Sequence, residues 1–106
     1  MTIKQLQYIV TVAEEGNITA AAKKLFIAQP SLTTAIRELE TEYNITIFMR
    51  SNKGIKLTSE GEEFLGYARQ VLEQAKLIDE RYMGKESGKL KFFVSAQHYS
   101  FAVEAF

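Results

Sequence analysis

Residues 19–42, TAAAKKLFIAQPSLTTAIRELETE, decide the fold of this chain, because they hold two short helical patterns joined by a tight turn. The first pattern opens at Thr19, whose hydroxyl can cap a free backbone N–H group, and it runs to Leu25. Its alanine run lets a second helix approach closely. Pro30 has a preset φ that suits the first turn of a helix, so a second helix is predicted from about Gln29. The stretch therefore predicts a helix-turn-helix.

The second of these helices has one apolar face and one polar face. The apolar face consists of Leu32, Ile36, Leu39 and Tyr43, spaced by four, three and four residues. The polar face consists of Ser31, Thr33, Thr34, Arg37, Glu38 and Thr41. Small hydroxyl groups and one guanidinium group can enter a DNA major groove and hydrogen-bond there. This face predicts a recognition helix, although a merely solvated face would show the same periodicity.

Length and composition limit the classes of protein that the chain can belong to. With 106 residues, 46% of them hydrophobic and 25% charged, it can form one small domain with an extended element. No stretch has the roughly 18 consecutive apolar residues of a membrane span, and no signal peptide precedes the first helical pattern. The chain has no cysteine, which excludes disulfides and thiolate metal sites. We expect a soluble, cytoplasmic protein with no metal site.

The charges are unevenly distributed, although the formal net charge is zero. Residues 1–58 carry seven basic and five acidic side chains, whereas residues 59–83 carry three basic and six acidic ones. A net charge of zero argues against a general nucleic-acid binder. The small positive excess coincides with the helix-turn-helix, so DNA binding would depend on a dimer rather than on charge alone.

The flanking segments predict a three-helix core with a two-stranded wing. Thr2 can cap a first helix that ends at Gly16 and Asn17. After the recognition helix, apolar residues from 45 to 48 and from 55 to 57 flank a turn at 51–54, as in a hairpin. Arg50 and Lys53 lie near the tip of this wing, where they are DNA contacts or simple solubilising charges.

A last helical pattern begins after Thr58 or Ser59, with Glu62 completing a capping-box pattern from Ser59. Apolar residues follow in heptad spacing. They are Phe64, Ala68, Val71, Ala75, Ile78 and Tyr82, widened by Leu65 and Leu72. This seam is wider than one small domain covers, so it predicts pairing with a second copy of the chain. Packing against the chain's own domain is the alternative.

Residues 1–82 resemble the N-terminal domain of a LysR-type transcriptional regulator. The resemblance rests on the opening KQLQYIVTVAEEGNITAAAKKLFIAQPSLTTAIRELE, on the later ITIFMRSNKGIKLTSEG, and on their order and spacing. It implies a mainly α winged helix-turn-helix, a long linker helix that pairs subunits, and a separate ligand-binding domain. The expected function is sequence-specific regulation of transcription as a DNA-bound homodimer, or a tetramer at full length.

The resemblance also implies a division of the chain. Residues 1–58 would be the DNA-binding domain, 59–83 the dimerisation linker helix, 84–88 a hinge, and 89–106 the truncated start of the effector-binding domain. Lys89 to Ser95 has the pattern of a strand, and Ser100 to Phe106 has the pattern of the start of a helix. A small-molecule effector is expected only in the missing domain, and no cofactor in this fragment.

The resemblance assigns roles to individual side chains. The amide of Gln29 would pair with a base edge, typically adenine, and the ring of Pro30 would contact a thymine methyl. Base reading would continue through Thr33, Thr34 and Arg37. Many relatives have arginine at the position of Thr34, so Arg37 is expected to compensate. Phosphate contacts are expected from Lys23, Lys24, Ser31, Arg50 and Lys53.

An enzyme is not expected, because the chain offers no nucleophile, base or metal constellation. His98 is the only histidine, and no glycine-rich phosphate loop follows a strand. The competing hypothesis is a protein-interaction or dimerisation module that uses the helix-turn-helix as a scaffold. Salt dependence separates the two, because DNA affinity falls with the number of phosphate contacts whereas a heptad interface hardly responds.

Overall fold

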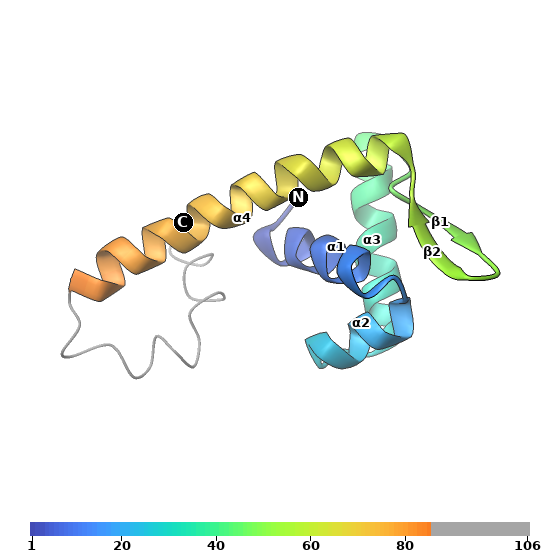
Figure 1. The fold of residues 1–106 in the computed structure, drawn as a ribbon, viewed down its shortest axis with the longest axis horizontal. Coiled ribbons are helices and arrows are strands. Elements are labelled where there is room, and N and C mark those ends of the chain that lie inside the picture. The colour runs from blue at the N-terminus through green and yellow to red at the C-terminus, as the bar shows by residue number, and fades with distance from the viewer. Residues whose placement is uncertain (86–106) are drawn as a thin grey trace. The chain divides into compact units, whose positions relative to one another are not determined.

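The computed structural model describes residues 1–85, and Figure 1 shows the order of their helices and strands. The elements are α1 (Ile3–Glu15), α2 (Ile18–Leu25), α3 (Gln29–Tyr43), β1 (Phe48–Ser51), β2 (Gly54–Leu57) and α4 (Ser59–Lys85). The two strands pair antiparallel, with Phe48 opposite Leu57 and Ser51 opposite Gly54. This is the mainly α winged helix-turn-helix with a long final helix that the sequence predicts. Residues 1–69 form one compact unit, and a second unit begins at Gln70.

Helix α1 has the termini that the sequence predicts. The N–H of Gln5 donates to the hydroxyl of Thr2 at 3.0 Å, and the N–H of Thr2 donates to the side-chain oxygen of Gln5 at 2.9 Å. This reciprocal pair is a capping box, which satisfies two of the free N–H groups at the helix start. At the other end, Gly16 has φ 68° and closes the helix in the left-handed region.

Helix α2 begins one residue earlier than the sequence predicts, and its cap is a different residue. The N–H of Ala20 donates to the side-chain oxygen of Asn17 at 2.8 Å, so Asn17 is the N-cap. The assignment of this cap to Thr19 is wrong, because Asn17 has the extended backbone of an N-cap (φ −157°) whereas Thr19 already lies inside the helix. The hydroxyl of Thr19 is therefore available for another partner.

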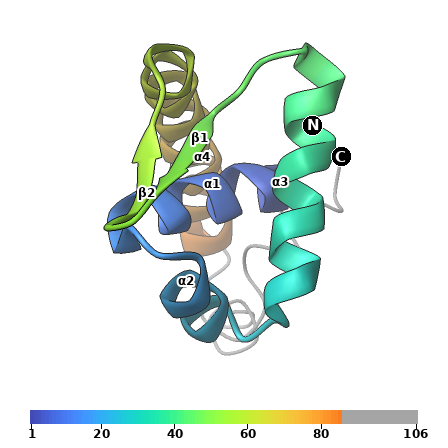
Figure 2. The same cartoon turned by 90° about the vertical axis from the view of Figure 1, so that its right-hand side faces the viewer.

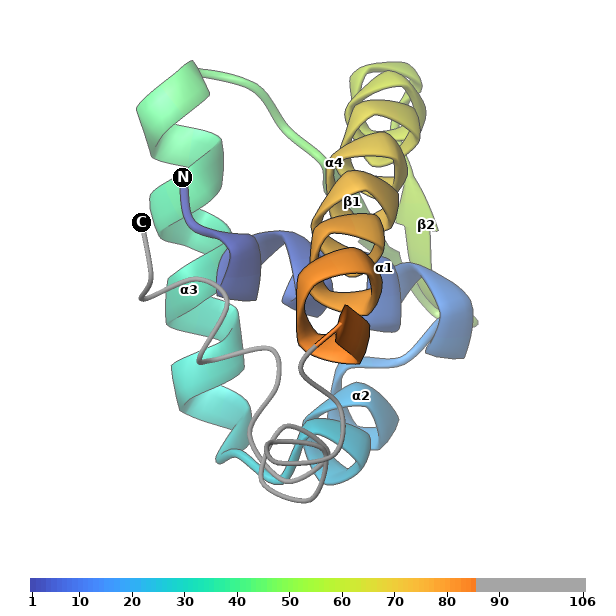
Figure 3. The same ribbon diagram turned by 90° about the vertical axis from the view of Figure 1, so that its left-hand side faces the viewer.

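The core lies where α1, α2 and α3 pack against one another. Its buried side chains are Ile9, Val12, Ile18, Ala21, Ala22, Leu32, Ile36, Leu39 and Ile47. Figures 1 and 2 both show α3 running across α1, and Figures 2 and 3 show the start of α3 beside α2. Tyr43 differs from the buried residues of the predicted apolar face of α3, because it is 43% exposed; its ring lies tilted against that of Phe64, with centroids 6.0 Å apart.

The wing is held against the turn between α1 and α2. The N–H of Ile55 donates to the carbonyl of Gly16 at 3.2 Å. Gly54 has φ 118°, and a Cβ atom there would lie 2.8 Å from the same carbonyl oxygen. Glycine is required at this position by both its backbone angle and the space. The close approach fixes the direction in which the two strands leave the domain.

The start of α4 is joined closely to the segment that enters β1. Thr58, rather than Ser59, caps the helix, because its hydroxyl oxygen accepts from the N–H of Gly61 at 2.8 Å. The same hydroxyl donates to the carbonyl of Thr46, and the N–H of Thr58 donates to the carbonyl of Ile47 at 3.0 Å. A Cβ atom on Gly61 would lie 2.1 Å from the carbonyl oxygen of Ile47. Only glycine fits where the helix passes this segment.

Helix α4 extends to Lys85, two residues beyond the predicted limit of 83. Gly84 thus belongs to the helix, although the sequence places the start of a hinge there. Lys85 of the expected hinge also belongs to the helix. Residues 86–88 lie outside the described residues, as do the expected strand and helix of 89–106 and His98. None of the helices within residues 1–85 combines the length and the apolar character needed to cross a membrane.

Candidate nucleic-acid interface

The start of α3 presents its polar side chains without using them for its own cap. The N-cap, Ala28, makes no side-chain hydrogen bond, and Pro30 occupies the first turn as the sequence predicts. The side-chain oxygen of Gln29 accepts from the hydroxyl of Thr19 at 3.0 Å. Both side chains are exposed, so the amide of Gln29 is held at the surface beside the first turn of α2.

The polar face of α3 is anchored by the core beneath it. Leu32, Ile36 and Leu39 are buried and determine which way the helix faces. As a result Ser31, Thr34 and Arg37 are exposed, and Thr33 is half-buried. Helical periodicity predicts the exposure of Ser31, Thr34 and Arg37 correctly, whereas Thr33, predicted on the same polar face, is partly covered.

The wing brings a second arginine next to α3. Arg50 of β1 and Arg37 of α3 line one surface hollow, together with Thr33, Ile36, Glu40 and other residues of the core edge. Neither arginine forms an ion pair with any residue of the described part of the chain. Two arginines from separate elements therefore line one hollow. Their proximity does not follow from the sequence spacing of 37 and 50.

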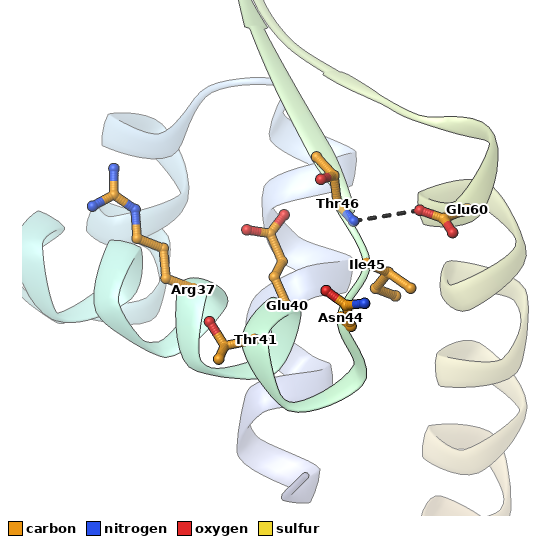
Figure 4. A pocket seen from close by; sticks show the side chains of 7 residues that line it. All are labelled: Arg37, Glu40, Thr41, Asn44, Ile45, Thr46 and Glu60. Carbon is orange, nitrogen blue, oxygen red and sulfur yellow. Dashed lines mark hydrogen bonds between the residues drawn. The ribbon is translucent and has the colours of Figure 1, made fainter.

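Glu40 connects α3 to the wing strand. Its carboxylate accepts from the N–H groups of Ile47 at 2.7 Å and of Phe48 at 3.3 Å. Figure 4 shows Glu40 projecting from α3 between Arg37 and Thr46. The surface hollow drawn there is also lined by Glu60, whose carboxylate accepts from the N–H of Thr46 at 3.4 Å. Helical periodicity does not distinguish Glu40 from its exposed neighbours Glu38 and Glu42, so this role was not predicted.

The predicted phosphate-contacting lysines are exposed, but they are not equivalent. Lys23 and Lys24 lie in the last turn of α2, and the ammonium group of Lys24 pairs with Glu15 at 3.4 Å. Lys53 lies in the wing turn, where its backbone N–H donates to the hydroxyl of Ser51 at 3.2 Å. Within residues 1–85, Lys23 and Lys53 have no ion-pair partner. Lys24 is therefore the least available of the three.

The apolar residues of α4 fall into two groups. Phe64 and Leu65 pack against the core of residues 1–69, and Ala68 is 2% exposed. In the second unit Val71, Ile78 and Tyr82 are exposed, and Leu72 and Ala75 are half-buried. Leu77 is also exposed, although it lies outside the predicted heptad positions.

Three packed helices, a two-stranded wing and a polar face on the third helix define a winged helix-turn-helix domain. The family model described as "Bacterial regulatory helix-turn-helix protein, lysR family" matches residues 3–62. The chain belongs to the LysR family of bacterial helix-turn-helix regulators. The resemblance that the sequence motifs indicate is thereby confirmed.

Similar proteins agree with this assignment. The HTH-type transcriptional regulator ClcR of Pseudomonas putida is 39% identical over 85% of this chain, which spans 31% of the length of ClcR. The crystal structure of a CbnR_DBD–DNA complex has 40% identity and a TM-score of 0.75, covering 81% of this chain and 99% of that one. The BenM_DBD complex with catB site 1 DNA has 37% identity and a TM-score of 0.78, covering 82% of this chain and 98% of that one.

Proposed function

We propose that this chain is the DNA-binding part of a LysR-type transcriptional regulator and that it binds a specific duplex sequence. Recognition would place α3 in the major groove and the wing on the adjacent backbone or minor groove. The observation that carries the proposal is the pair of arginines, Arg37 on α3 and Arg50 on the wing, at one hollow without ion-pair partners in residues 1–85. The likeness to domains solved as DNA complexes supports it.

The exposed side chains divide into two roles in this proposal. Base reading belongs to the first half of α3, because residues near the start of a recognition helix reach deepest into the groove. These residues are Gln29, Pro30, Thr33, Thr34 and Arg37. Backbone contacts belong to the cations and hydroxyl groups around them, which position the domain without reading sequence. These residues are Lys23, Lys24, Ser31, Arg50 and Lys53.

We also propose that two copies pair through α4. The small excess of basic side chains in residues 1–58 makes a single domain a weak DNA ligand. Two linked domains bind more tightly, because binding of the first raises the effective concentration of the second at the DNA. The exposed Val71, Ile78 and Tyr82 offer an apolar surface in heptad register. The same proposal includes a tetramer at full length, an effector-binding region elsewhere in the whole protein, and regulation of transcription without catalysis.

Fluorescence anisotropy with labelled random duplex at two salt concentrations tests DNA binding. We expect salt-sensitive binding, weakened by Arg50→Ala with a decrease of about one in the salt slope. Arg37→Ala should cost about 1–3 kcal/mol of affinity on a duplex selected from a random pool and should relax its base preference. Arg69→Ala, an exposed arginine outside the proposed surface, is the matched control. A folded sample that fails to bind duplex, or binds without salt dependence, would instead favour an interaction module.

A further inference from the structure

The hydrogen bond between Thr19 and Gln29 joins the two helices of the helix-turn-helix at their starts. The hydroxyl of Thr19 donates to Oε1 of Gln29 at 3.0 Å. Thr19 is free for this contact because Asn17, and not Thr19, caps α2. The amide of Gln29 makes no other hydrogen bond to a side chain or backbone group within residues 1–85.

In this contact Oε1 of Gln29 faces Thr19, and the hydrogen bond limits the rotamers that the glutamine side chain can adopt. A free glutamine side chain samples many rotamers, and its amide can turn over to exchange oxygen and nitrogen. With Oε1 held toward Thr19, the NH₂ group is left as an unused donor, and Oε1 keeps a second lone pair for another donor. The amide therefore presents one donor and one acceptor in a defined order.

We propose that Thr19 is a positioning residue that sets base specificity through Gln29. The presented donor and acceptor match adenine in the major groove, where N7 accepts and the N6 amino group donates. Guanine has acceptors at both N7 and O6, so the held carbonyl oxygen opposes O6. An amide that is free to turn discriminates less, because its NH₂ group can serve both guanine acceptors. This inference rests on the proposed function, in which Gln29 faces a base.

Selection of binding sequences from a random duplex pool tests the proposal with three variants. Gln29→Ala identifies the base pair that Gln29 reads, as the position whose preference is lost. Thr19→Val keeps the shape and the branched β-carbon but removes the hydroxyl, and it should lower the adenine-over-guanine preference at that position by about three- to tenfold. Thr19→Ser keeps the donor and should retain the wild-type preference. Circular dichroism checks that each variant is folded.

The double variant Thr19→Val/Gln29→Ala separates positioning from a direct contact. We expect it to match Gln29→Ala alone, because Thr19 acts only through the amide. If Thr19→Val weakens binding to all sequences equally and adds to Gln29→Ala, Thr19 contacts phosphate and the inference is wrong. If Gln29→Ala removes a preference that Thr19→Val leaves intact, the inference alone fails. If Gln29→Ala changes no preference, base reading by Gln29 fails together with it.

Discussion

Phe26 combines two features that are rarely found together in one residue. It closes α2 with φ 60°, in the left-handed region that bulky residues avoid, and its side chain is 93% exposed. The turn needs this backbone angle, because the N–H of Phe26 donates to the carbonyl of Lys23 at 3.2 Å while the chain reverses toward α3. Ile27, the next residue, packs against the core.

Phe26→Asn should therefore stabilise the domain. Asparagine tolerates the left-handed region, and an exposed ring gives up little burial, so the free energy of unfolding should rise by about 1 kcal/mol. Urea denaturation followed by circular dichroism measures it. Phe26→Ala is the control, because it removes the ring without easing the backbone and should bring no gain. If the two variants are equally stable, the left-handed angle carries no measurable cost.

At the scale of whole elements, the relation between α3 and the wing depends on hydrogen bonds to backbone groups. Glu40 holds the N–H groups that lead into β1, Thr58 holds the carbonyl groups of the same segment from the start of α4, and Gly16 accepts from β2. These contacts place Arg50 beside Arg37 at the same hollow. The wing is positioned by this set of contacts rather than by its own two short strands, which are too small to be stable alone.

Glu40→Ala tests this positioning. It leaves two backbone N–H groups without their acceptor, so the free energy of unfolding should fall by about 1–3 kcal/mol. DNA affinity should fall as well, because the wing loses its connection to α3. It is measured at a urea concentration at which the variant is still folded. Glu40→Gln keeps an acceptor oxygen, so it should lose less stability and less DNA affinity than Glu40→Ala.

Glu38→Ala, an exposed glutamate on the same helix, is the matched control and should change stability by less than about 0.5 kcal/mol. Equal effects of the alanine changes at 38 and 40 would show that the loss of negative charge, and not the wing contact, is what matters. A stable Glu40→Ala protein with wild-type DNA affinity would remove Glu40 from the positioning of the wing.

At the scale of the whole molecule, α4 carries apolar surface that the core of residues 1–69 does not use. Ala68 is 2% exposed, whereas Val71, three residues further along the seam, is 37% exposed. The two interpretations of the seam therefore apply to different parts of it: its start packs within its own domain, and we propose that its later part pairs with a second copy. Leu77 adds to the exposed apolar surface on this part of α4.

Val71→Glu should convert dimers to monomers, because pairing would bury an unpaired carboxylate between two apolar surfaces. Sedimentation equilibrium over a range of protein concentrations measures the change in association. Gln70→Glu adds the same charge at an exposed position away from the seam and should leave association unchanged. Persisting dimers in the Val71→Glu protein would place the interface elsewhere on the molecule.

The sequence by itself determined the elements of this protein, because their signals are local. The spacing of Leu32, Ile36 and Leu39 identifies the buried face of α3, and Pro30 and Gly16 mark where helices begin and end. Such signals depend on residues within one or two turns of each other, where helical geometry is fixed. The motifs also suffice to indicate the LysR family, because their order and spacing follow from that same succession of elements.

Only the tertiary structure decided which side chains act together. The contact of Thr19 with Gln29, the connection of Glu40 to the wing, and the hollow that Arg37 and Arg50 share all join segments that the folded core brings together. Local periodicity says which face a residue occupies, but it does not say which other segment lies opposite that face. That is determined by how the helices and the wing close around the buried core, where close packing allows few arrangements.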